Sequence, residues 1–373
     1  MPLATEPSCY ASTLRTVDRA RVALRCGEVV AIDDGEGRIA LTLAVETLTA
    51  EGLALLHRLT GAPPVLALTR WRAAALGLVT PGGPGVVALA PAGPLSAAAI
   101  HALVEPGRTS LRDEAAPALF EADPHAVAAV RLTKLAALLP TAVVAAAGPR
   151  TAAAAWSRAH DLRLVGTGEI AGYRRQEARA LRRVADARVP LADAPNAKVI
   201  AFRPSNGGHE HLAIVIGTPR PGQPVLVRMH SECFTGDLLG SLRCDCGEQL
   251  RRAIAAIAEQ GHGLVLYLAQ EGRGIGLVNK LRAYQLQDEG YDTLDANEAL
   301  GFDADERLYL PAAEILHQLG FDRVRLMTNN PDKMAQLARC GIEVTERVPH
   351  IIPSNDHNAA YLRAKAQRAG HLF

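Results

Sequence analysis

One stretch decides the fold and the chemistry of the second half of the chain: residues 225–247 read VLVRMHSECFTGDLLGSLRCDCG. The apolar run from Val225 to Met229 predicts a buried strand, and polar, reactive residues follow it directly. Further strands are expected at 213–217, 264–268 and 324–328, and helices at 247–259, 275–289, 310–318 and 332–339. Because alternating strands and helices are typical of an α/β layer, this half is expected to form an α/β domain.

Three cysteines in this stretch have the spacing of a metal site. Cys233 is followed by ten residues, then by Cys244, one further residue and Cys246. Thiolates suit Zn²⁺, and a structural zinc site normally has four protein ligands, whereas a catalytic site leaves one position for water. Three ligands therefore favour a catalytic zinc that generates a hydroxide nucleophile, unless His230 or His262 completes the shell. Three neighbouring free cysteines are the alternative.

Two turns are suited to phosphate groups. Residues 270–276, QEGRGIG, lie between an expected strand and an expected helix, where glycines let the backbone approach a ligand and the helix N-terminus favours an anion. Arg273 and Lys280 add positive charge there. Residues 328–333 stand in the same position after the next strand and end in Lys333. Each segment could also be a plain turn with an Asn or Asp cap.

A cluster of charged residues precedes the last expected helices. Residues 303–307 read DADER and place three carboxylates around one arginine. They are either a capped helix start or the source of a free carboxylate. A zinc hydroxide, two phosphate-suited turns and a free carboxylate together predict hydrolysis of a phosphorylated substrate of the nucleotide type.

Length and composition limit the class of protein. The 373 residues predict two domains, and 49% apolar residues exclude a mainly disordered chain. A net charge of +1 argues against a nucleic-acid binder with a wholly basic surface. Six cysteines are too few for a disulfide scaffold, and the first 25 residues lack the apolar core of a secretory signal. We therefore expect a cytoplasmic protein that binds neither nucleic acid nor a membrane.

The first half also has an α/β pattern, with strands expected at 29–32 and 39–45 and helices at 49–59 and 127–139. A helix is expected over 173–188, where six arginines stand against two acidic residues. It is either a solvated linker helix or a basic patch that recruits phosphate-bearing ligands. The expected organisation is a first domain over 1–172, an Arg-rich linker helix over 173–192 and a second domain over 193–373. Each domain is expected to be a mixed sheet with flanking helices.

The motifs of the second half resemble those of GTP cyclohydrolase II. The similar region runs from Val225 to Pro349 and continues weakly to residues 370–372. Its motifs are SLRCDCG (241–247), QEGR (270–273), NKLRAY (279–284) and LMTNNP (326–331). The resemblance implies α/β/α layers for this domain. It also implies hydrolysis of GTP to 2,5-diamino-6-ribosylamino-4(3H)-pyrimidinone 5′-phosphate, formate and pyrophosphate, the first step of riboflavin biosynthesis.

The same resemblance implies roles for individual residues. Cys233, Cys244 and Cys246 correspond to the ligands of one catalytic zinc ion. Arg307 corresponds to the residue that attacks or electrostatically stabilises the α-phosphate, Asp305 to a proton acceptor, and Tyr284 to a tyrosine that completes ring opening. The implied GTP contacts are Arg228, Met229, His230, Ser231, Glu232, Gln249, Glu271, Gly272, Arg273, Thr293, Thr328 and Lys333. Mg²⁺ on the GTP phosphates and a homodimer are further implications.

The first half resembles 3,4-dihydroxy-2-butanone 4-phosphate synthase, which is fused ahead of GTP cyclohydrolase II in bifunctional riboflavin proteins. The similar segments are residues 29–34, 130–136 and 171–175. The acidic loop that holds the metal of that family is missing, since residues 33–38 lead directly into the apolar residues 39–41. Its His-Thr-Glu segment is replaced by residues 125–127, and Arg131 stands where the family has an Asp. The first domain is therefore expected to be catalytically inactive.

Other functions remain open at this point. The chain could be a bifunctional enzyme with residual synthase activity, a GTP-binding regulator without turnover, or a structural zinc module that binds nucleic acid through the arginines of 173–188. It could also act on another purine nucleotide or release a formamide intermediate instead of formate. The near-zero net charge disfavours the nucleic-acid module.

Overall fold

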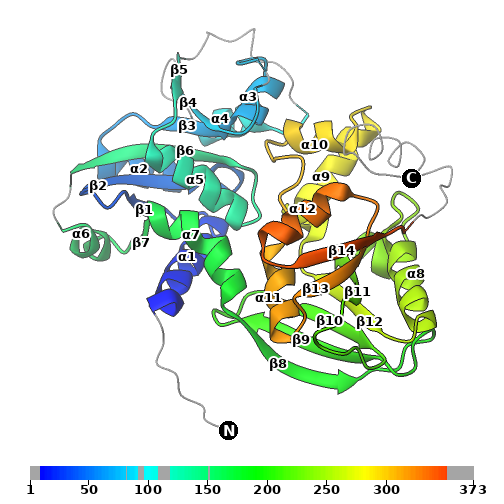
Figure 1. Cartoon of the computed structure of the whole chain (residues 1–373). Helices are drawn as coiled ribbons and strands as arrows, with labels where there is room; N and C mark the ends of the chain where they lie inside the picture. Colours follow the sequence, from blue (N-terminus) through cyan, green and yellow to red (C-terminus); the bar gives the residue numbers. More distant parts are fainter. Residues whose placement is uncertain (1–8, 81, 91–95, 108–117, 150–151, 351–373) are drawn as a thin grey trace. The chain divides into compact units, whose positions relative to one another are not determined.

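The computed structural model describes residues 9–80, 82–90, 96–107, 118–149 and 152–350, and the chain divides into two compact units. The first unit comprises Met1–Arg174 and Val278–Glu306, and the second comprises Arg175–Leu277 and Arg307–Phe373. Each unit contains one sheet of seven strands with flanking helices (Figure 1). The expected class, two α/β domains with mixed sheets, is confirmed. None of the helices in the described part of the chain is long and apolar enough to span a membrane.

The first unit is built around strands β1 to β7. Its elements in the first 179 residues are α1 (Cys9–Arg25), β1 (Val30–Asp33), β2 (Arg38–Ala44), η1 (Val45–Thr47), α2 (Ala50–Thr60), β3 (Val65–Thr69), α3 (Arg70–Ala75), β4 (Val86–Ala90), α4 (Ala97–Val104), β5 (Ala118–Glu121), α5 (Pro124–Leu135), β6 (Thr141–Pro149), α6 (Ala153–Ala159), β7 (Arg163–Gly166) and α7 (Thr167–Arg179). Helices α9 (Leu277–Asp288) and α10 (Thr293–Ala299) belong to its later segment.

The first sheet has the order β5-β4-β3-β6-β2-β1-β7, and all its neighbours are antiparallel except β1 and β7. Leu41, Leu43 and Leu68 from its strands pack with Leu56 of α2 in one fully buried core. Helix α2 begins where the sequence predicts, because the Thr49 hydroxyl accepts a hydrogen bond from the backbone N–H of Gly52. Apolar burial therefore accounts for the predicted elements of this unit.

The second unit begins with a strand. Its elements are β8 (Leu181–Arg188), β9 (Lys198–Pro204), β10 (His211–Ile216), β11 (Val225–Ser231), the helical turn η2 (Phe234–Leu238), α8 (Cys246–Glu259), β12 (Gly263–Leu268), the turn η3 (Glu271–Gly274), α11 (Leu310–Gln318), β13 (Arg323–Met327), α12 (Pro331–Arg339) and β14 (Glu343–Val348).

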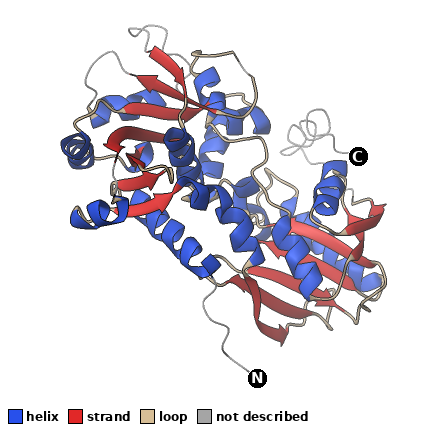
Figure 2. Ribbon diagram, turned by 60° about the vertical axis from the view of Figure 1, so that its left-hand side comes forward, coloured by secondary structure: helices blue, strands red, loops and turns tan. Residues whose placement is uncertain are grey.

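The second sheet has the order β14-β13-β11-β12-β10-β9-β8. The strands β14, β13, β11 and β12 are parallel, and the others join antiparallel. Side chains alternate along β11, so that Val225 and Val227 pack with α11 and α12, whereas Leu226 packs with α8 on the other face. Helices therefore cover both faces of this sheet, as the ribbon shows (Figure 2), in the expected α/β/α layers.

The helix predicted over 173–188 is wrong in its second half. Helix α7 ends at Arg179, and Leu181–Arg188 form the edge strand β8, which pairs antiparallel with β9. Only Leu181 of this strand is buried, so its sequence has no apolar alternation that would indicate a strand. Asp186 forms ion pairs with Arg183 and, at 2.5 Å, with Lys198 of β9. Charged side chains are typical of edge strands, because they discourage pairing with other molecules.

Candidate metal and nucleotide site

Three parallel strands of the second unit end at one edge of the sheet. Strand β11 lies between β12 and β13, so the strand order reverses there. Cys233 follows β11, the turn Glu271–Gly274 follows β12, and Thr328 follows β13. Ligands of open α/β sheets bind outside the carboxyl ends of the strands at such a reversal. The fold therefore brings the predicted metal segment and both predicted phosphate turns to the same edge.

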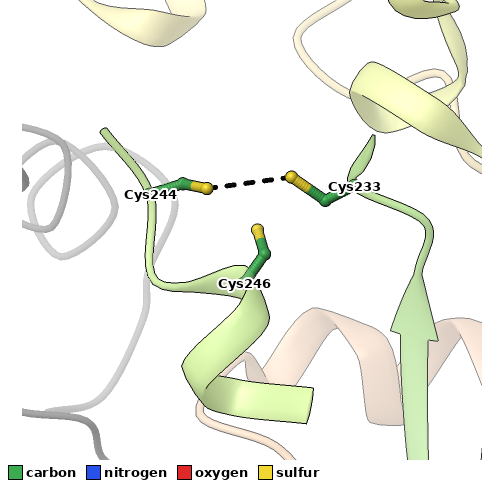
Figure 3. A group of neighbouring side chains, drawn as sticks. All are labelled: Cys233, Cys244 and Cys246. Atoms are coloured by element: carbon green, nitrogen blue, oxygen red, sulfur yellow. Dashed lines mark hydrogen bonds between the residues drawn. The ribbon is translucent and has the colours of Figure 1, made fainter. Parts of the chain in front are cut away.

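The three predicted metal ligands lie together. The Sγ atoms of Cys233, Cys244 and Cys246 all lie within 4.8 Å of one another, and those of Cys233 and Cys244 are 3.7 Å apart (Figure 3). Tetrahedral zinc with Zn–S bonds of about 2.3 Å separates its sulfur ligands by about 3.8 Å. The three thiols therefore fit one tetrahedral zinc ion. In the described residues, no histidine or carboxylate joins this cluster as a fourth ligand.

Two glycines make room for the thiols. A Cβ atom on Gly236 would lie 2.8 Å from Sγ of Cys244 and 3.0 Å from Sγ of Cys233. A Cβ atom on Gly247 would lie 2.1 Å from the carbonyl oxygen of Gly236. Real Cβ atoms do not approach other atoms so closely, because the core is already close-packed. The glycines of the motif are thus required by the packing around the sulfur atoms.

The chemistry of the thiols also suits a cation. Hydrogen bonding with Cys233 raises the pKa of Cys244 to about 11. Hydrogen bonds from Cys233 and Cys244, together with burial, raise the pKa of Cys246 well above its usual value. Three adjacent thiols resist ionisation because each thiolate repels the next, and a bound dication removes this repulsion.

Asp237 joins the metal segment to the sheet. Its carboxylate, with the side chain 8% exposed, accepts hydrogen bonds from the backbone N–H of Cys233 and from the Tyr267 hydroxyl, both at 3.0 Å. Nε2 of His230 lies 3.1 Å from both carboxylate oxygens. Burial lowers the pKa of His230, so its neutral ring donates the Nε2 proton to Asp237. His230 therefore supports the cysteine segment instead of completing the thiol cluster.

A second buried network connects β11 with the cysteine turn. The guanidinium of Arg228 donates to the carbonyl oxygen of Met327 at 3.1 Å and to Oε1 of Gln249. The amide of Gln249 donates to Oδ2 of Asp245 at 2.5 Å. Burial lowers the pKa of Arg228 to about 10, which leaves it charged at neutral pH. Both ends of the Gln249 carboxamide thus hold the residue that stands between Cys244 and Cys246.

The turn after β12 is tied to the metal segment as well. Oε2 of Glu271 accepts a hydrogen bond from the backbone N–H of Phe234 at 2.6 Å, and Oε1 accepts one from Gly272 at 2.9 Å. Gly272 and Arg273 both have left-handed backbone conformations, with φ of 62° and 61°. Such a conformation is rare for a residue with a side chain and is typical of functional turns. It confirms a specialised turn at the predicted position between strand and helix.

The turn after β13 holds its own shape through side chains. The backbone N–H of Asn330 donates to the Thr328 hydroxyl at 3.0 Å, and the Asn330 side chain caps α12 at Asp332. Lys333 lies in the first turn of α12 and is 8% exposed. Its positive charge contributes to lowering the pKa of His230. The lysine is therefore close enough to the strand end to act electrostatically there.

The remaining predicted residues differ in their surroundings. Met229 is buried in the apolar core, whereas Ser231 and Glu232 are partly exposed at the end of β11. Tyr284 on α9, Thr293 at the start of α10 and the exposed Asp305 belong to the first unit. Arg307 opens the last segment of the second unit, and its charge acts on Arg228. The weak similarity at residues 370–372 lies outside the described residues.

Sequence reasoning missed the residues that support the cysteines. Asp237, Tyr267 and His350 carry no spacing signal of their own. His350 lies near Gln249, with Nε2 2.9 Å from its carbonyl oxygen, although 101 positions separate the two residues. Only Asp237, four residues after Cys233, stood close enough in the sequence to be suspected.

Comparison with known proteins supports the motif assignment. A family model for GTP cyclohydrolase II matches residues 182–349. A GTP cyclohydrolase-2 of Azospirillum brasilense is 57% identical over 366 residues, which cover 97% of this chain and 95% of the relative. A riboflavin biosynthesis protein RibBA of Synechocystis sp. is 47% identical over 256 residues, which cover 66% of this chain and 46% of that protein. The chain thus spans about half the length of the Synechocystis relative.

Among solved structures, the chain resembles RibBX, a two domain 3,4-dihydroxy-2-butanone 4-phosphate synthase from A. baumannii. That likeness covers 90% of this chain and 99% of the other, with 17% identity and a TM-score of 0.38. The identity to the Azospirillum relative extends over nearly the whole of both chains. On the strength of this relative and of the matching family model, the chain belongs to the GTP cyclohydrolase II family of enzymes.

Proposed function

We propose that this chain is a zinc-dependent GTP cyclohydrolase II that hydrolyses GTP with release of formate and pyrophosphate, as a step of riboflavin biosynthesis. The observation that carries the proposal is the three-thiol cluster at the carboxyl end of β11, next to the two phosphate-suited turns. The names of the Azospirillum and Synechocystis relatives agree with it.

Zinc, when bound by Cys233, Cys244 and Cys246, supplies a Lewis acid that activates water near neutral pH. The chain's own groups bind and orient the nucleotide. Arg273 and Lys333 supply positive charge for the phosphates, on which we also expect Mg²⁺. Glu232 can accept hydrogen bonds from the N–H groups of a guanine edge.

The proposed catalytic groups are Arg307, Asp305 and Tyr284. A guanidinium stays protonated in water, so Arg307 is better suited to stabilise the charge that develops on the α-phosphate than to attack it. Asp305 is proposed to accept a proton, and Tyr284 to transfer one while the ring opens and formate leaves. We propose that GTP is the substrate and that the working molecule is a cytoplasmic homodimer.

We propose further that the first unit has no synthase activity. Its early acidic residues are engaged in a turn: Oδ1 of Asp33 accepts from Gly35 at 2.8 Å, and Asp34 pairs with Arg38 at 2.6 Å. His125 lies 3.2 Å from the carbonyl oxygen of Arg38. A magnesium site for a sugar phosphate needs carboxylate oxygens that are not already committed. Incubation with ribulose 5-phosphate and Mg²⁺ is expected to give no product.

The main test is turnover of GTP by the zinc-loaded protein with Mg²⁺, following formate and pyrophosphate together. Equimolar release of both, lost in the Cys244→Ser variant, is the expected result. Pyrophosphate without formate would indicate that the reaction stops at a formamide intermediate. Binding of GTP without either product would replace the enzyme with a GTP-binding regulator.

A further inference from the structure

Residues 278–306, here called the anchored segment, are held by side chains from the first 174 residues. The carboxylate of Glu46, just after β2, pairs with both terminal nitrogens of Arg282 on α9, at 2.9 and 3.0 Å. The same carboxylate accepts a hydrogen bond from the backbone N–H of Leu139 at 2.8 Å. These side chains are only 19% and 24% exposed, so water screens the pair incompletely.

A second contact lies on the same face of α9. The side chain of Asn279 is buried, donates to the carbonyl oxygen of Ala137 at 3.1 Å and accepts from Arg282 at 2.7 Å. Ala137 has a left-handed backbone, with φ of 56°, which is rare for a residue with a Cβ. Asn279 and Arg282 are three residues apart and therefore share one side of the helix.

Tyr284 lies on the other side of the same helix. Nζ of Lys280 is 5.8 Å from the centre of the Tyr284 ring, and the two are four residues apart. Because successive residues turn by about 100° around a helix, this pair points away from Asn279 and Arg282. The anchoring face and the face that carries the proposed catalytic tyrosine are thus separate.

The other end of the anchored segment is fixed around Asp305. Nζ of Lys134 on α5 pairs with Asp303 at 3.2 Å and with Glu306 at 2.5 Å, so that it holds residues on both sides of Asp305. The indole N–H of Trp71 donates to Asp303 at 2.8 Å. Burial by itself would raise the pKa of Asp303, but Lys134 and Trp71 lower it below its usual value, so the carboxylate stays charged.

The chain between these two ends is packed as closely. The buried guanidinium of Arg72 donates to the carbonyl oxygen of Ala299 at 2.9 Å. Gly301 has φ of 94°, and a Cβ atom there would lie 2.8 Å from the Thr69 hydroxyl. The segment is thus joined to the first unit at its start, its middle and its end.

We propose that the first unit, although inactive as a synthase, positions Tyr284 and Asp305 for the cyclohydrolase reaction through Glu46, Lys134 and Trp71. These three are positioning residues, because they act through the anchored segment. The proposal rests on the proposed function and gives the first unit a part in it. Misplacement of a reacting group by about 1 Å can slow a reaction roughly 100-fold, so a loosened segment would be seen in the rate.

The test compares full-length variants by two readouts, formate release from GTP and hydrogen exchange of the anchored segment. Lys134→Met and Glu46→Gln each remove one charge pair with little change of volume. Each is expected to accelerate exchange in residues 278–306 and to lower kcat about 10-fold or more, with unchanged zinc content and unchanged exchange in β9 to β13. Lys134→Arg, which keeps the charge, is expected to recover most of the rate.

Glu36→Gln is the matched control, since Glu36 pairs with Arg38 on the exposed surface of the same unit. It is expected to leave both readouts unchanged. Faster exchange in the anchored segment with an unchanged rate would overturn the proposal, as would a slower rate with unchanged exchange. A wild-type chain that releases no formate would remove the proposed function itself, and exchange would then still decide whether these residues hold the segment.

Discussion

The carboxylate of Asp237 accepts a hydrogen bond from the backbone N–H of Cys233 at 3.0 Å, and this contact joins a metal-ligand residue to the sheet. Tyr267 of β12 and His230 of β11 converge on the same carboxylate. A group that fixes the backbone of a ligand sets the direction of the sulfur atom. Such outer contacts commonly change metal affinity by about 10-fold to 100-fold.

Replacing Asp237 with Asn is therefore expected to weaken zinc binding about 10-fold or more, because the amide bears no charge and accepts fewer hydrogen bonds. Competition with a chromophoric chelator measures the affinity directly. Tyr267→Phe, which removes one of the donors to Asp237, should give a smaller loss. Equal zinc affinity in wild type and Asp237→Asn would show that the contact does not position Cys233.

Gly236→Ala tests the space among the thiols. The added Cβ would lie 2.8 Å from Sγ of Cys244, so the cysteines must move apart. We expect loss of stoichiometric zinc and of formate release. Gly168→Ala is the control, because a Cβ on Gly168 of α7 meets nothing within 4 Å. An alanine at 236 that retains one tightly bound zinc would contradict the packing argument.

The stability of the protein is expected to fall on acidification through His211. Burial lowers the pKa of His211 to about 4 in the folded chain, below its ordinary value of 6.5. Between these values the unfolded chain binds more protons, so stability is present above the unfolded pKa and is lost as pH falls. The loss between pH 7 and pH 5 amounts to about 2 kcal/mol.

Urea unfolding at the two pH values measures this loss. His211→Gln should show a smaller loss on acidification than wild type, even though it is less stable at neutral pH, since Nδ1 of His211 accepts the backbone N–H of Ala269. His209→Gln, a change at an exposed neighbour, should behave like wild type. An unchanged pH slope in His211→Gln would assign the effect to other groups.

Arg228→Lys is expected to destabilise the second unit by about 1–3 kcal/mol. The flat guanidinium contacts the carbonyl oxygen of Met327 and the side chain of Gln249 together, and an ammonium on a lysine stem does not match both directions. Thermal unfolding reports the loss. Arg252→Lys on the exposed side of α8, where the pair with Glu248 is 49% and 41% exposed, is the control and should change little.

Much of the second unit could be predicted from its sequence. The helix expected at 310–318 is observed as Leu310–Gln318, because its apolar residues recur with the helical period and pack on the sheet. The cysteine cluster was predictable for a similar reason, since its ligands lie in one short segment. The comparisons confirm the family that its motifs indicated.

Other features depend on contacts that no local pattern records. Strand β8 has one buried side chain, so only its backbone pairing with β9 distinguishes it from a continued helix. The pairing of Glu46 with Arg282 joins residues 236 positions apart. Such a pair becomes visible only when the chain has folded, and for this reason the place of residues 278–306 in the first unit was not foreseen.

The discontinuous first unit has a consequence for synthesis on the ribosome. Its last sheet strand, β7, ends at Gly166, but the anchored segment emerges only after residues 167–277 have been made. Until then Glu46, Lys134 and Trp71 lack the partners that they have in the finished chain. Domains commonly fold in order as they leave the ribosome. Here the first unit reaches its final packing late, when most of the second sheet has already been translated.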